Sequence, residues 1–158
     1  MKKVVIVCTG NTCRSPMAEA IFKDLINNKG QANEILVSSA GIYAFDGDGA
    51  SPQAIEVMKK EYGIDLIKHR ARVLDGSDIE DADIILVMTK HHKQMILDIY
   101  PEAVSKVHLL KEYAGSEGYT DIIDPFGQDY NTYKKCANEL EESILDVIDR
   151  IITGQIQL

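Results

Sequence analysis

The chain has 158 residues, which suits one domain, and its 45% of hydrophobic and 27% of charged residues are ordinary for a globular protein. Lys and Arg number 17 against 25 Asp and Glu, so the formal net charge is −8. This acidic balance argues against binding to nucleic acid or to anionic membranes, because both need clustered cations. No apolar run can span a bilayer, and three cysteines are too few for a disulfide framework. We expect a reduced, cytoplasmic, monomeric protein with neither nucleic acid nor membrane as a partner.

The first part of the chain alternates strands with helices. Residues 3–7 form a β-branched run that is typical of a buried strand. A polar loop over residues 8–15 leads into a helix over residues 16–28, for which Ser15 is the expected N-cap. A second strand is predicted over residues 34–39.

The same alternation continues through the middle of the chain. A loop rich in Gly and Asp covers residues 41–49, and a helix follows over residues 53–62. A short helix over residues 77–82 precedes a third strand over residues 83–88. The next helix covers residues 90–99 and ends before a proline.

A strand, a loop and a long helix complete the pattern. The fourth strand is predicted over residues 106–110, and the Gly- and Pro-containing residues 113–128 are predicted to form a loop. The last helix covers about residues 129–152. Its apolar stripe consists of Cys136, Leu140, Ile144, Val147, Ile148 and Ile151.

Four apolar strands separated by helices predict the fold class. Their continuous rather than alternating hydrophobicity indicates an α/β fold with an open four-stranded parallel sheet and helices on both faces. No repeat or linker interrupts the chain, so we expect a single domain over residues 1–158. Ligands bind such sheets at the carboxyl ends of the strands. The loop after the first strand is therefore the first place to expect chemistry.

That loop joins a cysteine to an arginine. Cys8 ends the first strand, and Arg14 lies six residues later at the start of a helix, with Gly10 between them. Such a loop can turn its N–H groups inward around an oxyanion, and the guanidinium of Arg14 can bind two of the oxygens. We expect Cys8 to rest as a nucleophilic thiolate there, with Ser15 donating a hydrogen bond to its sulfur. A buried, inert Cys8 with a surface Arg14 is the alternative.

Residues 7–16, Val-Cys-Thr-Gly-Asn-Thr-Cys-Arg-Ser-Pro, resemble the signature of the low-molecular-weight protein tyrosine phosphatase family. The likeness extends over nearly the whole chain, at residues 38–41, 69–72, 82–88 and 124–126. It implies a phosphatase that hydrolyses phosphorylated protein side chains through a thiophosphate intermediate on the enzyme. It also implies that no metal or other cofactor is needed.

The resemblance implies a role for each matching residue. Cys8 would be the nucleophile, Arg14 the phosphate clamp and Asp124 the general acid and base. From the residues alone, Asp121 and Asp129 are equally good acids. The implied phosphate-binding loop comprises Thr9, Gly10, Asn11, Thr12, Cys13, Arg14 and Ser15.

The resemblance also implies roles for the residues that support the loop and for Cys13. Asn11, Ser15 and His69 would support the loop from behind, although without the resemblance His69 would be interpreted as a surface histidine. Cys13 could pack as a small apolar residue, or it could pair with Cys8 and protect that thiol from irreversible oxidation.

The substrate is predicted from the position four residues after the nucleophile. Tyrosine-directed relatives usually carry a bulky aliphatic residue there, whereas Thr12 resembles the protein arginine phosphatase branch. A hydroxyl suits a polar guanidinium better than an aromatic ring. Tyr43 and Phe126 would form aromatic walls on either side, and these walls accept either substrate. We expect phosphoarginine, with phosphotyrosine as the alternative.

Other functional classes fit the sequence less well. Arsenate reductases of this fold relay oxidation through two cysteines in the middle of the chain, and no cysteine lies between Cys13 and Cys136. A non-catalytic anion-binding module would need neither Cys8 nor Asp124. A metal site is not expected, because the adjacent His91 and His92 would point to different faces of a helix and are interpreted as solvated residues.

Overall fold

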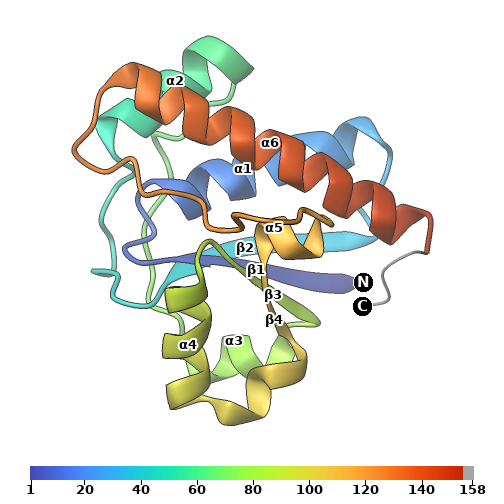
Figure 1. The fold of residues 1–158 in the computed structure, drawn as a ribbon. Helices are drawn as coiled ribbons and strands as arrows, with labels where there is room; N and C mark the ends of the chain where they lie inside the picture. Colours follow the sequence, from blue (N-terminus) through green and yellow to red (C-terminus); the bar gives the residue numbers. More distant parts are fainter. Residues whose placement is uncertain (155–158) are drawn as a thin grey trace.

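A computed structural model, which describes residues 1–154, contains one four-stranded sheet in the order β2-β1-β3-β4 with every neighbouring pair parallel (Figure 1). The strands are β1 (Lys2–Cys8), β2 (Ile35–Gly41), β3 (Ile84–Val87) and β4 (Val107–Leu109). The predicted open parallel sheet is confirmed. The last four residues of the predicted domain, 155–158, lie outside the described part of the chain.

Helices cover both faces of the sheet, as predicted. They are α1 (Arg14–Asn28), α2 (Pro52–Tyr62), α3 (Gly76–Asp81), α4 (Lys90–Ile99), α5 (Leu110–Tyr113) and α6 (Tyr130–Ile152), with a 3-10 helix at Pro101–Ser105. Figure 1 shows α1, α2 and α6 on one face and α3 and α4 on the other. No helix within residues 1–154 combines the length and hydrophobicity needed to cross a membrane.

The side chains of β1 alternate between two separate hydrophobic cores. Val4 and Ile6 pack with α1, α2 and α6, whereas Val5 and Val7 pack with α3 and α4. Because each β1 side chain from Val4 onward is buried on one face or the other, the strand is apolar from Val4 to Cys8. This is why the sequence shows a continuous apolar run there.

Two details of the predicted elements were wrong. Helix α1 begins at Arg14, and Ser15 does not cap it, because the Ser15 hydroxyl contacts the Cys8 sulfur instead. Helix α5 was not predicted, since its four residues are too few to show a helical period. By contrast, Asp129 caps α6 at the predicted start of that helix through a hydrogen bond from the Thr132 N–H.

The sheet has a topological switch point between β1 and β3. The chain leaves β1 towards α1 on one face, and it leaves β3 towards α4 on the other face (Figure 1). A crevice between the two connections is the usual ligand site of such sheets. Cys8 lies at this edge, in register with Gly41 on β2.

Gly41 leaves room for the loop that follows β1, and this gives a prediction about stability. A Cβ at Gly41 would lie 2.7 Å from the Thr9 carbonyl oxygen and 2.9 Å from the Asn11 nitrogen. Both are backbone atoms, so Gly41→Ala should lower the free energy of unfolding by about 1–3 kcal/mol. Urea unfolding measures this change. Gly49→Ala is the control, since its Cβ would meet only the Arg70 side chain at 3.9 Å; equal losses in the two variants would contradict the prediction.

Candidate active site

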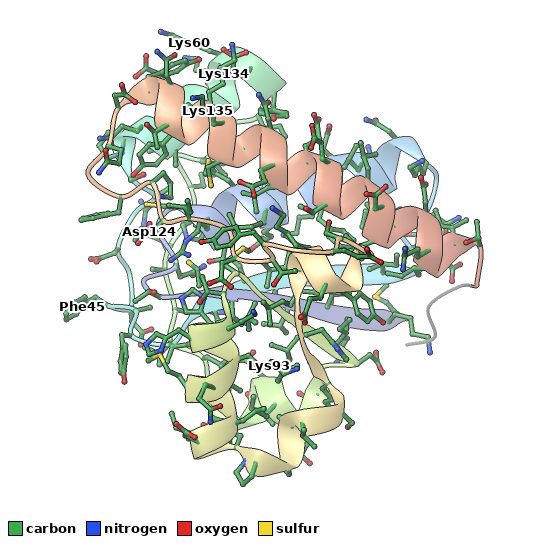
Figure 2. All side chains as sticks on the ribbon, in the orientation of Figure 1. Phe45, Lys60, Lys93, Asp124, Lys134 and Lys135 are labelled. Atoms are coloured by element: carbon green, nitrogen blue, oxygen red, sulfur yellow. The ribbon has the colours of Figure 1, made fainter. Side chains whose placement is uncertain are left out.

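A cavity of about 200 Å³ lies at the switch point. It brings Cys8, Arg14 and Asp124 together, although Asp124 is more than a hundred residues away in the sequence. The complete lining consists of Cys8, Thr9, Gly10, Thr12, Cys13, Arg14, Asp124 and Phe126. Figure 2 shows Asp124 on the segment that leads into α6, close to the loop between β1 and α1.

Most backbone carbonyl groups of residues 8–13 are hydrogen-bonded to other parts of the chain. The Cys8 and Thr9 carbonyls accept hydrogen bonds from the N–H groups of residues 42 and 43, and the Thr12 carbonyl accepts one from Ser51. The backbone N–H groups of residues 9–14 take part in none of the hydrogen bonds found within residues 1–154. A loop whose carbonyl acceptors are hydrogen-bonded to the protein and whose N–H donors are available is suited to holding an anion.

Arg14 is a buried charge, with 4% of its surface exposed. Its Nη1 donates to the Ile122 carbonyl at 2.9 Å, and its Nη2 lies 3.5 Å from Asp124 Oδ2. Its Nε is buried and has no hydrogen-bond partner among the described residues. A buried guanidinium with an unused donor at the wall of a cavity provides strong attraction for an oxyanion.

The Cys8 thiol lies 3.0 Å from the Ser15 hydroxyl, as the sequence predicted. Asn11 supports this pair from behind by donating a hydrogen bond to the Ser15 hydroxyl at 2.8 Å. Its backbone is left-handed, with φ at 56°, which is uncommon for any residue other than glycine. Its carbonyl oxygen lies 2.7 Å from His69 Nε2, so His69 contacts the loop at the predicted place.

The three acids that the sequence left open have different surroundings. Asp121 accepts a hydrogen bond from the Lys90 N–H at the start of α4, and Asp129 accepts hydrogen bonds from Thr132 in α6. Both therefore fix backbone segments. Among the three, Asp124 alone lines the cavity, with about half of its side chain exposed. The structure thus places one carboxylate where a leaving group could receive a proton.

His92 contradicts its interpretation as a solvated residue. Only its neighbour His91 is exposed, whereas His92 is 3% exposed and its Nε2 lies 2.9 Å from the Thr9 hydroxyl. Burial, together with the nearby charge of Arg14, lowers the pKa of His92 to about 4, so the imidazole is neutral at physiological pH. It is a loop contact that sequence reasoning missed; the only signal was its place in the first turn after β3.

The remaining cysteines are free thiols. Cys13 is buried, and its sulfur lies 3.2 Å from the hydroxyl of Tyr133, whose pKa is raised by burial and by this hydrogen bond. Cys136 is buried in the core, as predicted from its place in the apolar stripe. Burial raises the pKa of the Cys136 thiol to about 12, which makes it a poor nucleophile.

One predicted pocket residue does not line the cavity. Thr12 and Phe126 are part of the lining, and the ring of Phe126 is exposed. Tyr43 meets the loop through its backbone N–H, which donates to the Thr9 carbonyl, while its ring is 66% exposed. The predicted pair of facing aromatic walls is therefore present on one side only.

No metal ligand set is assigned. Within residues 1–154, no group of three or more His, Cys, Asp or Glu side chains is arranged to hold a metal ion.

Comparisons with known proteins identify the family to which the chain belongs. The family model described as low molecular weight phosphotyrosine protein phosphatase matches residues 3–154. The chain belongs to this family. It is 42% identical, over 97% of its length and 98% of the relative, to a protein-arginine-phosphatase of Geobacillus stearothermophilus.

Solved structures of this phosphatase family have the same fold. A low molecular weight protein tyrosine phosphatase from T. tengcongensis superposes with a TM-score of 0.89 at 44% identity, covering 96% of this chain and 100% of that one. A cysteine-to-serine mutant of the YwlE arginine phosphatase, with a phosphorylated active site serine, has a TM-score of 0.89 at 37% identity, covering 97% of each chain.

The buried His92 predicts a loss of stability in mild acid. Its pKa falls from 6.5 to about 4 on folding, so the folded state resists protonation. The contribution of His92 to the free energy of unfolding is then fully present above pH 6.5 and is lost as the pH falls towards 4. Between about pH 7.5 and pH 5, this should lower the free energy of unfolding by about 2 kcal/mol.

Urea unfolding at the two pH values tests this expectation. His92→Gln keeps a polar side chain near Thr9 but cannot titrate, so its loss in acid should be about 2 kcal/mol smaller than that of the parent. His91→Gln, at the exposed neighbouring position, should keep the parental pH dependence. The same acid loss in His92→Gln as in the parent would contradict the assignment.

Proposed function

We propose that this phosphatase removes phosphate from arginine side chains of proteins, with Cys8 as the nucleophile. The observation that supports this proposal is the convergence of Cys8, Arg14 and Asp124 on one cavity whose walls also include Thr12. A thiol, a fixed cation and a carboxylate are the three groups that nucleophilic phosphoryl transfer requires.

In the first step the Cys8 thiolate attacks phosphorus, and an S–P bond forms as the bond to the leaving side chain breaks. Arg14 and the N–H groups of the loop neutralise the charge on the phosphoryl oxygens. Asp124 gives its proton to the departing nitrogen of arginine, or to the oxygen of tyrosine in the alternative.

In the second step water releases the phosphate. The Asp124 carboxylate takes a proton from the attacking water, and the S–P bond breaks. The electron pair returns to sulfur, where the nearby Ser15 hydroxyl stabilises the thiolate as it leaves. The products are inorganic phosphate, the dephosphorylated side chain and the original enzyme. The phosphorylated active site serine in the mutant arginine phosphatase supports a phosphoenzyme formed at the residue corresponding to Cys8.

Thr12 supports arginine as the substrate. It lines the cavity, so its hydroxyl can face a guanidinium that follows the phosphate into the site. The relative from Geobacillus is named as an arginine phosphatase, whereas the structure from T. tengcongensis is titled as a tyrosine phosphatase. Phosphotyrosine therefore remains the second candidate.

Three further statements belong to this proposal. We propose that Cys13 pairs with Cys8 under oxidation, that residues 1–158 form one phosphatase domain, and that the enzyme acts as a cytoplasmic monomer on phosphoproteins without nucleic acid. The free state of all three cysteines and the net charge of −8 support this setting.

The assignment of Cys8 and Asp124 predicts two different losses. Cys8→Ser should abolish turnover while the variant still binds inorganic phosphate. In a non-catalytic binding module, by contrast, the parent and Cys8→Ser would both bind phosphate and neither would turn over substrate. Asp124→Ala should slow a substrate with a poor leaving group by about 10²–10⁴-fold, and an activated aryl phosphate by much less. Steady-state kinetics over a series of aryl phosphates measures both. Asp129→Ala is the control outside the cavity, and a loss in Asp124→Ala that ignores the leaving group would contradict its role as acid.

The substrate assignment predicts the selectivity of Thr12 variants. The parent should prefer a phosphoarginine peptide over the matched phosphotyrosine peptide in kcat/KM. Thr12→Ile removes the hydroxyl and should reduce that preference by about tenfold, the value of one lost hydrogen bond. Thr12→Ser keeps the hydroxyl and should keep the preference for arginine. A parent that prefers phosphotyrosine would leave the catalytic roles intact and make Thr12 a packing residue.

A further inference from the structure

A line of hydrogen bonds runs from the Cys8 sulfur to a carboxylate outside the cavity. Cys8 Sγ lies 3.0 Å from Ser15 Oγ, which accepts from Asn11 Nδ2 at 2.8 Å. The same Asn11 nitrogen donates to Ser39 Oγ at 2.9 Å, and Ser39 donates to Glu19 Oε1 at 2.5 Å. Glu19 lies on α1, one turn after Ser15, and it does not line the cavity.

The direction of every proton in this line follows from the Asn11 amide. Asn11 Oδ1 accepts a hydrogen bond from the Arg72 N–H at 3.1 Å, so its NH₂ group must face the two serines. Both serine oxygens then act as acceptors towards Asn11. Because a hydroxyl carries one proton, the proton of Ser39 points to Glu19 and the proton of Ser15 is free for the Cys8 sulfur.

We propose that Glu19 is a positioning residue for the reaction, because its carboxylate keeps the Ser15 proton directed at Cys8. This inference rests on the phosphatase function proposed above. Glu19 never touches the substrate. It acts through Ser39 and Asn11 on the step in which the Cys8 thiolate leaves phosphorus.

The alternative arrangement shows why a carboxylate matters. If the Asn11 amide turned over, it would lose the Arg72 N–H, its oxygen would accept from both serines, and the Ser15 proton would be withdrawn from the sulfur. Glu19 adds to the Arg72 contact in opposing this arrangement. Ser39 can donate to Asn11 in that way only by giving up Glu19, and a hydrogen bond to a carboxylate is roughly twice as strong as one to a neutral group. Burial strengthens this preference, since Asn11 is 0% and Ser39 4% exposed.

Other contacts hold Glu19 in place. Its second oxygen pairs with Lys23 Nζ at 2.6 Å, one helical turn further along α1, and 21% of the Glu19 side chain is exposed. Ser15 has one other acceptor, the Ala40 carbonyl at 3.5 Å, which is too long to hold the proton against the sulfur. The geometry therefore favours donation to Cys8 as long as Ser39 keeps its carboxylate.

The test compares Glu19→Gln with the parent in pre-steady-state and steady-state assays on an aryl phosphate. Slower departure of sulfur should reduce kcat roughly 3- to 10-fold and enlarge the burst of leaving group, because the phosphoenzyme accumulates. Inhibition by inorganic phosphate should stay within about twofold of the parent, since the groups that bind the anion are untouched. Asp24→Asn, an exposed carboxylate on the same helix, should behave as the parent does.

A second variant separates this role from a general effect on folding. Ser39→Ala should reproduce the loss of kcat, and Glu19→Gln added to Ser39→Ala should cause no further loss, because the connection is already broken. A parental kcat and burst in either single variant would overturn the inference, as would equal losses in kcat and in phosphate binding. A parent that does not hydrolyse the aryl phosphate would overturn the proposed function and this inference together. An active parent whose kcat and burst are unchanged in Glu19→Gln overturns this inference alone.

Discussion

The side chain of Asn11 holds the loop after β1 in its binding conformation. A left-handed backbone at a residue other than glycine costs about 1–3 kcal/mol and persists only where its surroundings enforce it. Here the enforcement comes from three parts of the chain, because Asn11 is hydrogen-bonded to Ser15 on α1, to Ser39 on β2, and to His69 and the Arg72 N–H. The inward-facing N–H groups of the loop depend on these contacts.

The buried charge of Arg14 joins this loop to the segment that carries Asp124. Arg14 donates to the Ile122 carbonyl and lies beside Asp124, while the Ile122 N–H donates to the Met88 carbonyl at the end of β3. Asp121 ties the same segment to the start of α4. One guanidinium thus lines the cavity and anchors the segment of Asp124, the proposed general acid, so a change at Arg14 affects both.

The sequence was informative where chemistry and topology coincide in one short segment. The cysteine, the arginine and the strand that precedes them lie within residues 2–14, so local patterns sufficed to predict that Cys8 and Arg14 meet at the sheet edge. Asp124 could be singled out only through the resemblance, because nothing local distinguishes it from Asp121. His92 was misjudged, since adjacency on a helix indicates that two side chains diverge but not which of them faces the core. The role of Ser15 as an N-cap was also wrong, because its hydroxyl contacts the Cys8 sulfur and local sequence patterns do not reveal such a tertiary contact.

His92 and Glu19, two groups that support the loop, differ in charge and in their distance from the cavity. His92 contacts Thr9 on the cavity wall, and burial together with the Arg14 charge keeps its imidazole neutral by lowering its pKa to about 4. Glu19 is an anion that would repel phosphate at close range, but Ser39 and Asn11 separate it from the cavity. A neutral contact at the cavity wall and a carboxylate two hydrogen-bonded side chains away therefore support the loop without placing a negative charge at the cavity.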